Sequence, residues 1–175
     1  DPANRPAGIN LSWLDIEERR FDEARTRLRK MLSRQADDPD VLFELGVLES
    51  RAGHLDEAIK VWQRADDFQR RDPRPGLAIV DALERQRKAA AALVVAKALS
   101  ARFSEDIHVQ LTLSRTYFNG GEPVLGKLAL QEATRMVGFD AERQVHIGRL
   151  QLLAGNADAA AYNATKALQA RPDDV

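Results

Sequence analysis

The sequence predicts an all-α fold, a solenoid of antiparallel helix pairs, and two recurring columns of residues carry this prediction. Small residues recur every 34 positions, at Ala24, Ala58, Ala92, Gly126 and Ala160. Aliphatic residues recur at the same interval, at Leu11, Leu45, Ile79, Leu113 and Ile147. A fixed period of about 34 residues is typical of a helix–turn–helix repeat whose units stack on one another.

The period divides the chain into five units, over 5–38, 39–72, 73–106, 107–140 and 141–174. We number the positions within each unit from column 1 to column 34, so that Ala24 lies in column 20. No linker interrupts the series, so we expect one domain over residues 1–175. The chain has neither an initiator methionine nor a signal-like segment, and we therefore expect it to be part of a longer protein.

Each unit is expected to hold two helices joined by a turn. In the second unit, apolar residues recur at helical spacing over 41–48, and Gly53 follows where a turn needs a positive φ. Asp56 and Glu57 then favour the N-terminus of a second helix, whose apolar stripe spans 58–65. The small residue in column 20 lets the two helices approach closely, because a larger one would overpack the contact.

The other units follow the same order, with local departures. In the fourth unit Pro123 lies at an expected first helical position, where a missing N–H costs nothing. Units one and three are degenerate, since Arg19 and Arg87 replace the turn glycine and Val80 replaces the small residue in column 8.

Composition excludes several classes of function. The net charge is −1 and aromatic residues make up 6% of the chain, so a nucleic-acid-binding stripe is not expected. The chain has no cysteine, which excludes disulfides and thiolate metal sites. No apolar run approaches the roughly 18–20 residues that cross a bilayer, so we expect no membrane insertion by this segment. Neither a nucleophile elbow nor a phosphate-binding glycine loop is present, and we predict a non-enzymatic protein without a cofactor.

These columns resemble the tetratricopeptide repeat over nearly the whole chain. The second unit carries the pattern best, with Leu42, Leu45, Gly46, Gly53, Ala58, Trp62 and Ala65. The resemblance implies a right-handed superhelix with a concave surface that the first helix of each pair lines. It also implies a protein or peptide segment as the partner.

The Ala-rich and Arg-rich style of the units looks like bacterial exported repeat proteins. Examples are the repeat lipoprotein of PEP-CTERM/exopolysaccharide gene clusters and the periplasmic repeat regions of polysaccharide exporters. This likeness favours a periplasmic or outer-membrane-associated location over a cytoplasmic one, although cysteine content leaves the compartment open.

Carrying the family's lining columns onto this sequence gives a candidate partner-binding groove. Its apolar contacts would come from aromatic and aliphatic side chains, and arginines would bind carboxylates of the ligand. The candidate residues are Trp13, Phe43, Arg51, Arg85, Leu111, Arg115, Phe118, His146 and Arg149. Arg115 and Arg149 share column 9 in adjacent units, which predicts a basic patch at that end.

Each assignment has a plainer alternative. Column 5, which includes Phe43 and Leu111, could pack inside, and the arginines could form a solvated face. Trp13 could be a binding residue or a buried contact. His108, Glu142 and His146 could hold zinc, but we expect two solvated histidines and no metal. The carboxylate clamp of chaperone-binding relatives needs a Lys in column 5 and an Asn in column 9, a pair that no unit has.

Two functions therefore remain at this point. The first is a protein–protein interaction scaffold that binds a partner segment on its concave face. The second is a spacer or assembly element of a bacterial secretion or exopolysaccharide-export system. The last helix carries Ala161, Ala164 and Leu168 with no solvating helix after it, so end-to-end self-association is also expected.

Overall fold

The computed structural model describes residues 4–136 and 140–170, and it folds them entirely into helices and turns. Residues 137–139 of the fourth repeat and 171–174 of the fifth lie outside the described residues. The helices are α1 (Arg5–Glu17), α2 (Phe21–Leu32), α3 (Pro39–Arg51), α4 (Leu55–Phe68), α5 (Arg74–Arg85), α6 (Ala89–Arg102), α7 (Ile107–Asn119), α8 (Pro123–Met136), α9 (Ala141–Leu153) and α10 (Ala157–Ala170).

The helices follow the 34-residue period of the sequence. The even-numbered helices begin at Phe21, Leu55, Ala89, Pro123 and Ala157, each 34 residues after the last. The odd-numbered helices keep the same interval except α5, which begins one residue late. The predicted all-α repeat of helix pairs is thereby confirmed for the described residues, and α8 begins at Pro123 as expected.

The first helix of each pair follows a polar residue that caps it, at column 34 of the preceding repeat. The side chains of Asn4, Asp38, Asp106 and Asp140 each accept a backbone N–H from the first turn of the following helix. Asp72 accepts the backbone N–H of Arg74 in the same way. Such caps satisfy amide groups that the helix itself leaves without partners, and each stabilises a helix by about 1 kcal/mol.

The turn inside each helix pair requires a residue with positive φ. Gly53, Gly121 and Gly155 have φ values of 89°, 79° and 74°. Arg19 and Arg87 occupy the same column with φ values of 60° and 58°. The two units without a turn glycine therefore keep the turn at a conformational cost, since left-handed backbone disfavours residues with a Cβ.

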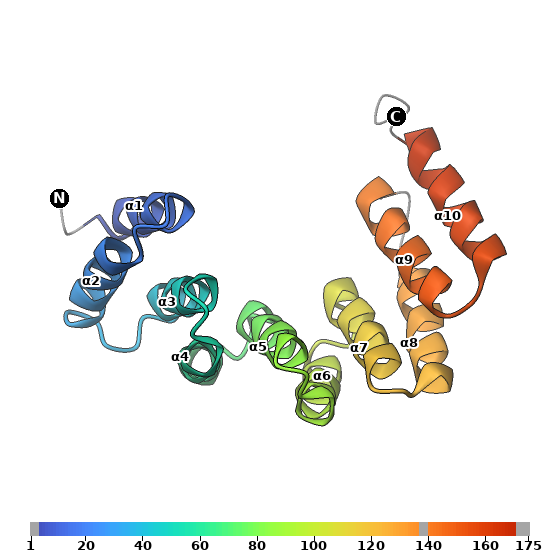
Figure 1. Ribbon diagram of the computed structural model, residues 1–175, viewed down its shortest axis with the longest axis horizontal. Helices are drawn as coiled ribbons and strands as arrows, with labels where there is room; N and C mark the ends of the chain where they lie inside the picture. The colour runs from blue at the N-terminus through green and yellow to red at the C-terminus, as the bar shows by residue number, and fades with distance from the viewer. Residues whose placement is uncertain (1–3, 137–139, 171–175) are drawn as a thin grey trace. The chain divides into compact units, whose positions relative to one another are not determined.

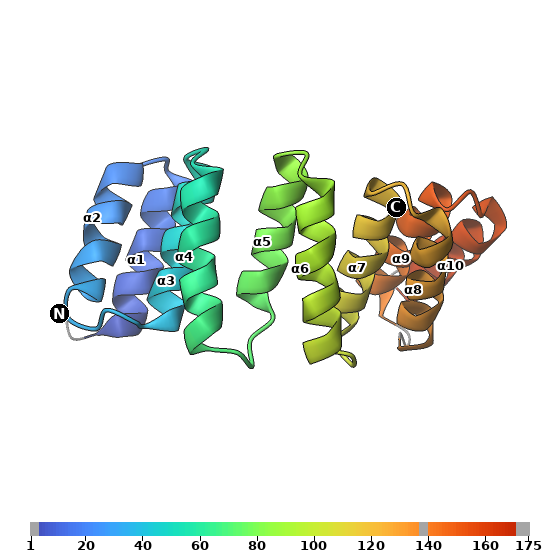
Figure 2. The same ribbon diagram turned by 90° about the horizontal axis from the view of Figure 1, so that it is seen from below.

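The chain also divides into two larger compact parts, residues 1–86 and 87–175, which we call unit 1 and unit 2. These two differ from the five 34-residue units of the sequence, which we call repeats from here on. In unit 1, α2 runs antiparallel beside α1, and α4 runs antiparallel beside α3 (Figures 1 and 2). The contact between α3 and α4 depends on small residues: Ala58 is fully buried, and a methyl group added at Gly46 would overlap the indole ring of Trp62. The indole N–H donates to the carbonyl oxygen of Phe43 at 3.1 Å. Trp62 is 4% exposed, which confirms its predicted place in the core.

Successive pairs of the first unit meet through an apolar seam. One side comes from α1 and α2, and the other comes from α3. The buried residues of this seam are Ile16, Ala24 and Leu28 on one side and Val41, Leu45 and Leu48 on the other. We call this arrangement the repeat interface.

Unit 2 has the same kind of apolar contact between helix pairs, made by different residues. Leu111, Leu130, Ile147 and Leu150 form its buried cluster, which Phe118 flanks. A Cβ added at Gly126 would lie 2.9 Å from the ring of Phe118, so the small residue in column 20 again permits the close approach. None of the helices in the described part of the chain is long and apolar enough to cross a membrane.

Candidate partner-binding surface

The predicted groove residues all lie on first helices of the pairs, but they belong to two compact units. Unit 1 holds Trp13 on α1, Phe43 and Arg51 on α3, and Arg85 on α5. Unit 2 holds Leu111, Arg115 and Phe118 on α7 and His146 and Arg149 on α9. We therefore describe two candidate surfaces separately.

In unit 1, Trp13 is a surface residue. Its side chain is 50% exposed, so the alternative of a buried contact is wrong. Phe43 is half-buried, and the guanidinium carbon of Arg74 lies 5.0 Å from the centre of its ring. This cation–π contact covers part of the ring face that a ligand would use.

The two arginines predicted in unit 1 already have polar partners on neighbouring helices. Arg51 lies 3.6 Å from Glu17 of α1, and Arg85 donates a hydrogen bond of 2.8 Å to the hydroxyl of Ser50 on α3. These contacts link α1, α3 and α5 and agree with the plainer alternative for these arginines. A ligand would have to compete with them.

In unit 2, one predicted groove residue is in the core. Leu111 is 2% exposed and packs with Leu130 and Ile147, so its assignment to a binding surface is wrong. The physical reason is that column 5 of α7 points at the following helix pair. Phe118 is also partly buried, because its ring packs over Gly126.

The remaining residues of unit 2 form a basic patch, which we define as Arg115, His146 and Arg149. The pKa of His146 lies below its ordinary value, first because its imidazole is partly buried and then because of the charges of Arg115 and Arg149. His108 acts in the same direction and Glu142 acts against it. Arg115 lies on α7 and His146 and Arg149 lie on α9, two helices that pack against each other, so the basic patch remains a prediction for this face.

The zinc alternative does not fit this geometry. Within the described residues, no three His, Cys, Asp or Glu side chains lie close enough together to hold a metal ion. His108, Glu142 and His146 therefore do not form the ligand set that their spacing allowed.

Besides Asp38, which caps α3, two buried carboxylates in unit 1 were not predicted from the sequence. Asp15 is 5% exposed and accepts hydrogen bonds from Arg20 and Arg27, at 2.7 Å and 2.8 Å. Glu49 is 3% exposed and accepts from Arg25 at 2.7 Å, and it lies 2.8 Å from Nδ1 of His54. Both acids occupy column 11, and this shared column is the signal that could have found them.

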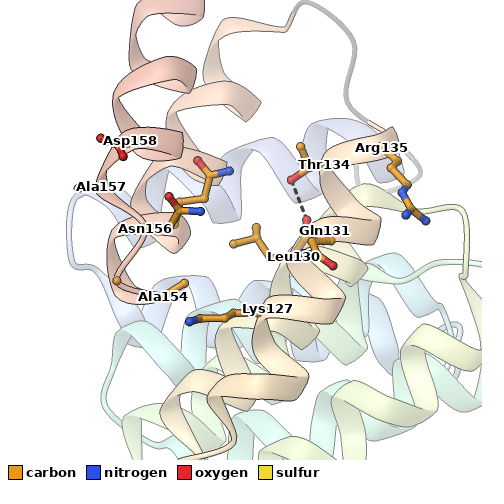
Figure 3. Close-up of a pocket in the computed structure, with 11 residues that line it drawn as sticks. Lys127, Leu130, Gln131, Thr134, Arg135, Ala154, Asn156, Ala157 and Asp158 are labelled. Atoms are coloured by element: carbon orange, nitrogen blue, oxygen red, sulfur yellow. Dashed lines mark hydrogen bonds between the residues drawn. The ribbon is translucent and has the colours of Figure 1, made fainter.

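The equivalent position in unit 2 is an open cavity of about 720 Å³ with both polar and apolar lining residues (Figure 3). By the repeat register, Arg25, Glu49 and His54 correspond to Lys127, Gln151 and Asn156, which all line this cavity. Figure 3 shows Lys127 on α8 and Asn156 at the start of α10 on opposite sides of the opening. The cavity thus lies where unit 1 has a buried ion pair between repeats.

Comparison with known proteins supports the repeat assignment. Residues 1–78 match the family model described as "Tetratricopeptide repeat". The chain is 33% identical over 79 residues to "Cellulose synthase operon protein C" of Pseudomonas fluorescens (strain SBW25). This match covers 45% of the chain and 6% of that protein, so the chain spans a small fraction of this curated relative.

Several solved structures have the same fold. MamA of Desulfovibrio magneticus RS-1, from residue 41 to its end, superposes with a TM-score of 0.71 at 20% identity, covering 100% of this chain and 98% of that one. TTC0263, a thermophilic TPR protein of Thermus thermophilus, gives 0.73 at 20% identity over 97% and 92%. YrrB, described as a TPR protein with an unusual peptide-binding site, gives 0.62 at 15% identity over 95% and 86%.

These findings confirm the resemblance to the tetratricopeptide repeat. The family model covers residues 1–78, and the solved structures extend the same fold over nearly the whole chain. The tetratricopeptide fold is a protein–protein interaction scaffold, and proteins built from it are generally non-catalytic.

Proposed function

We propose that the chain is a non-enzymatic scaffold that binds an acidic segment of a partner protein on the face formed by α7 and α9. The observation that carries this proposal is that Arg115 and Arg149 occupy the same column of α7 and α9, two helices that pack against each other. Among the described residues none forms an ion pair with Arg149, so its guanidinium can bind a carboxylate in the forked geometry that arginine prefers. The exposed Val145 and Leu152 beside the patch on α9 supply apolar contact area.

The fold likeness supports a peptide segment as the ligand. One solved protein with the same fold is described as having a peptide-binding site. In the proposed complex, positive charge attracts the acidic segment and sets its direction, whereas apolar contacts supply much of the affinity.

A labelled peptide of ten glutamates tests the proposal, with a peptide of ten lysines as the charge control. Fluorescence anisotropy at low salt should show binding of the acidic peptide only, and Arg149→Glu should weaken it about tenfold, which is about 1.4 kcal/mol. Arg135→Glu is the matched control, because Arg135 is exposed on α8 in the same unit and pairs with its helical neighbour Glu132. Equal binding by wild type and Arg149→Glu would rule out the patch.

The protonation of His146 gives an independent readout. A bound carboxylate would raise the pKa of His146 from its lowered value, so binding takes up a proton. Affinity for the acidic peptide should therefore rise as the pH falls from 8 toward 6. NMR titration of the imidazole, assigned with His146→Gln, should show the pKa rise in the complex; an unchanged pKa would contradict contact at the patch.

The similarity to a cellulose synthase operon protein favours a second candidate function. In this alternative the chain is a spacer or assembly element of a polysaccharide-export system, and its surface chemistry matters less than its length. In the parent protein, a spacer would tolerate Arg115→Glu with Arg149→Glu and would also tolerate replacement by an unrelated helical repeat of equal length. Loss of polysaccharide secretion with the charge reversal alone would exclude the spacer.

A further inference from the structure

The cavity of Figure 3 exists because unit 2 has smaller side chains than unit 1 at equivalent columns. In unit 1, Leu32 and Leu55 are half-buried, and Leu32 packs against the repeat interface. In unit 2 the same columns hold Thr134 and Ala157, which both line the cavity. Leu130 also lines the cavity and is 4% exposed. Apolar side-chain volume is therefore missing beside Leu130.

The charges at this position differ between the two units as well. In unit 1, Arg25 donates to both carboxylate oxygens of Glu49, at 2.7 Å and 3.1 Å. In unit 2 the cation is kept as Lys127, but the acid is replaced by the neutral Gln151. Among the described residues none forms an ion pair with Lys127. The cavity thus keeps the positive charge of the ion pair and lacks its carboxylate.

Two amide side chains add hydrogen-bond donors to the cavity. The amide oxygen of Gln151 accepts from Asn163 at 2.6 Å, so its amide nitrogen is the group left to donate. The amide oxygen of Asn156 accepts the backbone N–H of Ala159 at 3.2 Å, which leaves the nitrogen of Asn156 in the same position. Since Lys127 and Asn156 stand on opposite sides of the opening, a carboxylate between them meets donors from both sides (Figure 3).

We propose that this cavity is a binding site for a carboxylate ligand with a short apolar body. The carboxylate takes the place that Glu49 holds in unit 1, and it binds Lys127 and the amide nitrogen of Gln151. The apolar body lies over Leu130, where the two leucines of unit 1 have no counterpart, and its burial adds to the affinity. A small carboxylic acid and a glutamate side chain of a partner protein both offer this chemistry.

The site is separate from the basic patch, because none of the three patch residues lines the cavity. It also needs no further repeat to complete it. In the described part of the chain, Arg25 and Glu49 bond only to residues of repeats one and two, although repeat three follows them. Asp158 at the cavity does not exclude a carboxylate, since unit 1 holds the buried Glu49 although Asp56 occupies the same column.

Isocaproate, a branched aliphatic carboxylate, is the probe for the test. Titrated into the isotope-labelled chain, it should shift the NMR signals of Lys127, Gly155 and the side-chain amide of Gln151 in a saturable way. Isocaproamide lacks the charge and acetate lacks the apolar body, so each should bind about tenfold more weakly. Equal affinity for the three probes, or shifts spread over the whole surface, would overturn the proposal.

Two variants assign the binding to the cavity. Lys127→Met should weaken isocaproate binding about tenfold, and because Lys127 is exposed this change should leave the fold intact. Gln151→Glu supplies the carboxylate from the chain itself and should abolish binding. Lys97→Met is the matched control, since Lys97 is exposed on α6 in the same unit and lies beside the ring of Tyr117. Equal affinities of wild type and Lys127→Met would overturn the assignment, whether or not Gln151→Glu folds.

A blocked peptide, Ala-Glu-Leu-Ala, separates the two sources of the carboxylate. Tighter binding of this peptide than of isocaproate, lost when its Glu is replaced by Gln, identifies an acidic side chain of a partner protein. Weaker binding of the peptide identifies a small carboxylic acid. In both cases Lys127→Met must weaken the tighter ligand, and a tighter ligand that ignores this change would refute the site.

Discussion

Replacing Arg25 with methionine should destabilise unit 1 strongly, although both residues are long and fill similar space. Arg25 extends from α2 to Glu49 on α3, and its Nε and Nη2 donate to the two carboxylate oxygens at 2.7 Å and 3.1 Å. The Glu49 side chain is 4% exposed and that of Arg25 is 18% exposed. The substitution removes both donors and leaves a carboxylate buried between two repeats.

The magnitude follows from the burial of the pair. Removing one partner of a buried ion pair costs about 3–5 kcal/mol, because the remaining charge has lost its solvation and its partner. His54 stays beside Glu49 and retains one contact, so we expect the lower end, about 3 kcal/mol. An exposed pair behaves differently, and removal of its arginine costs at most about 1 kcal/mol.

Urea unfolding followed by tryptophan fluorescence measures this loss, because the buried Trp62 reports on unit 1. Arg64→Met is the matched control, since Arg64 lies 2.8 Å from Asp37 in a pair whose side chains are about half exposed. A loss below about 1 kcal/mol for Arg25→Met, or equal losses for the two variants, would refute the reasoning.

The pKa of Glu49 determines how the stability difference between wild type and Arg25→Met changes with pH. Burial of Glu49 works to raise its pKa, but the hydrogen bonds from Arg25 and His54 outweigh burial and hold the pKa below its ordinary value. In wild type this group therefore stabilises the fold above the unfolded pKa near 4.5, and the stabilisation is lost as the pH falls through the lowered pKa. In Arg25→Met burial prevails and the pKa rises. The gap between the two proteins should then shrink from pH 7 to pH 4.

Three further substitutions have clear expected outcomes. Arg87→Gly should stabilise the chain by about 0.5–1 kcal/mol in urea unfolding, because glycine accepts the positive φ of that turn more readily. Gly46→Ala should lower the free energy of unfolding by about 1–3 kcal/mol and alter tryptophan fluorescence, since the added methyl group meets the indole ring of Trp62. Gly148→Ala in the same column is the control, because its methyl group meets atoms no closer than 3.4 Å and should cost less than about 1 kcal/mol. Lys127→Arg combined with Gln151→Glu should rebuild the Arg25–Glu49 ion pair of unit 1 in the cavity of Figure 3. The double variant should then gain about 1 kcal/mol of unfolding free energy beyond the sum of the two single changes. A double-mutant cycle without coupling would contradict this equivalence.

The repeat period made most of the fold predictable from the sequence. Helix starts, the buried small residue of column 20 and the turn glycines all depend on local requirements that recur every 34 residues. Even the degenerate turns at Arg19 and Arg87 keep the register, because the flanking helices impose the backbone conformation. Local rules and packing agree at these positions, so the sequence pattern was sufficient.

The candidate site was less predictable, because burial within a column changes from repeat to repeat. Column 5 is half-buried at Phe43, buried at Leu111 and exposed at Val145. The difference arises from what packs over each helix, which a column alone does not contain. The buried Glu49 was missed for a related reason: its partner Arg25 is 24 residues away in another repeat, and isolated carboxylates usually lie in solvent.

The register of the basic patch also constrains the shape of its ligand. Arg115 and Arg149 share a column on two packed helices, and packed helices lie about 8–10 Å apart. A polyproline II segment rises about 3.1 Å per residue with three residues per turn, so every third side chain returns to one face after about 9 Å. Acidic residues three positions apart would therefore reach both arginines, whereas in a β-strand such residues point to opposite faces.

A peptide repeating Glu-Pro-Pro should bind more tightly than one of equal length and charge in which the glutamates are contiguous, and Arg149→Glu should abolish the difference. Equal affinity for the two peptides would show that the patch attracts charge without recognising spacing.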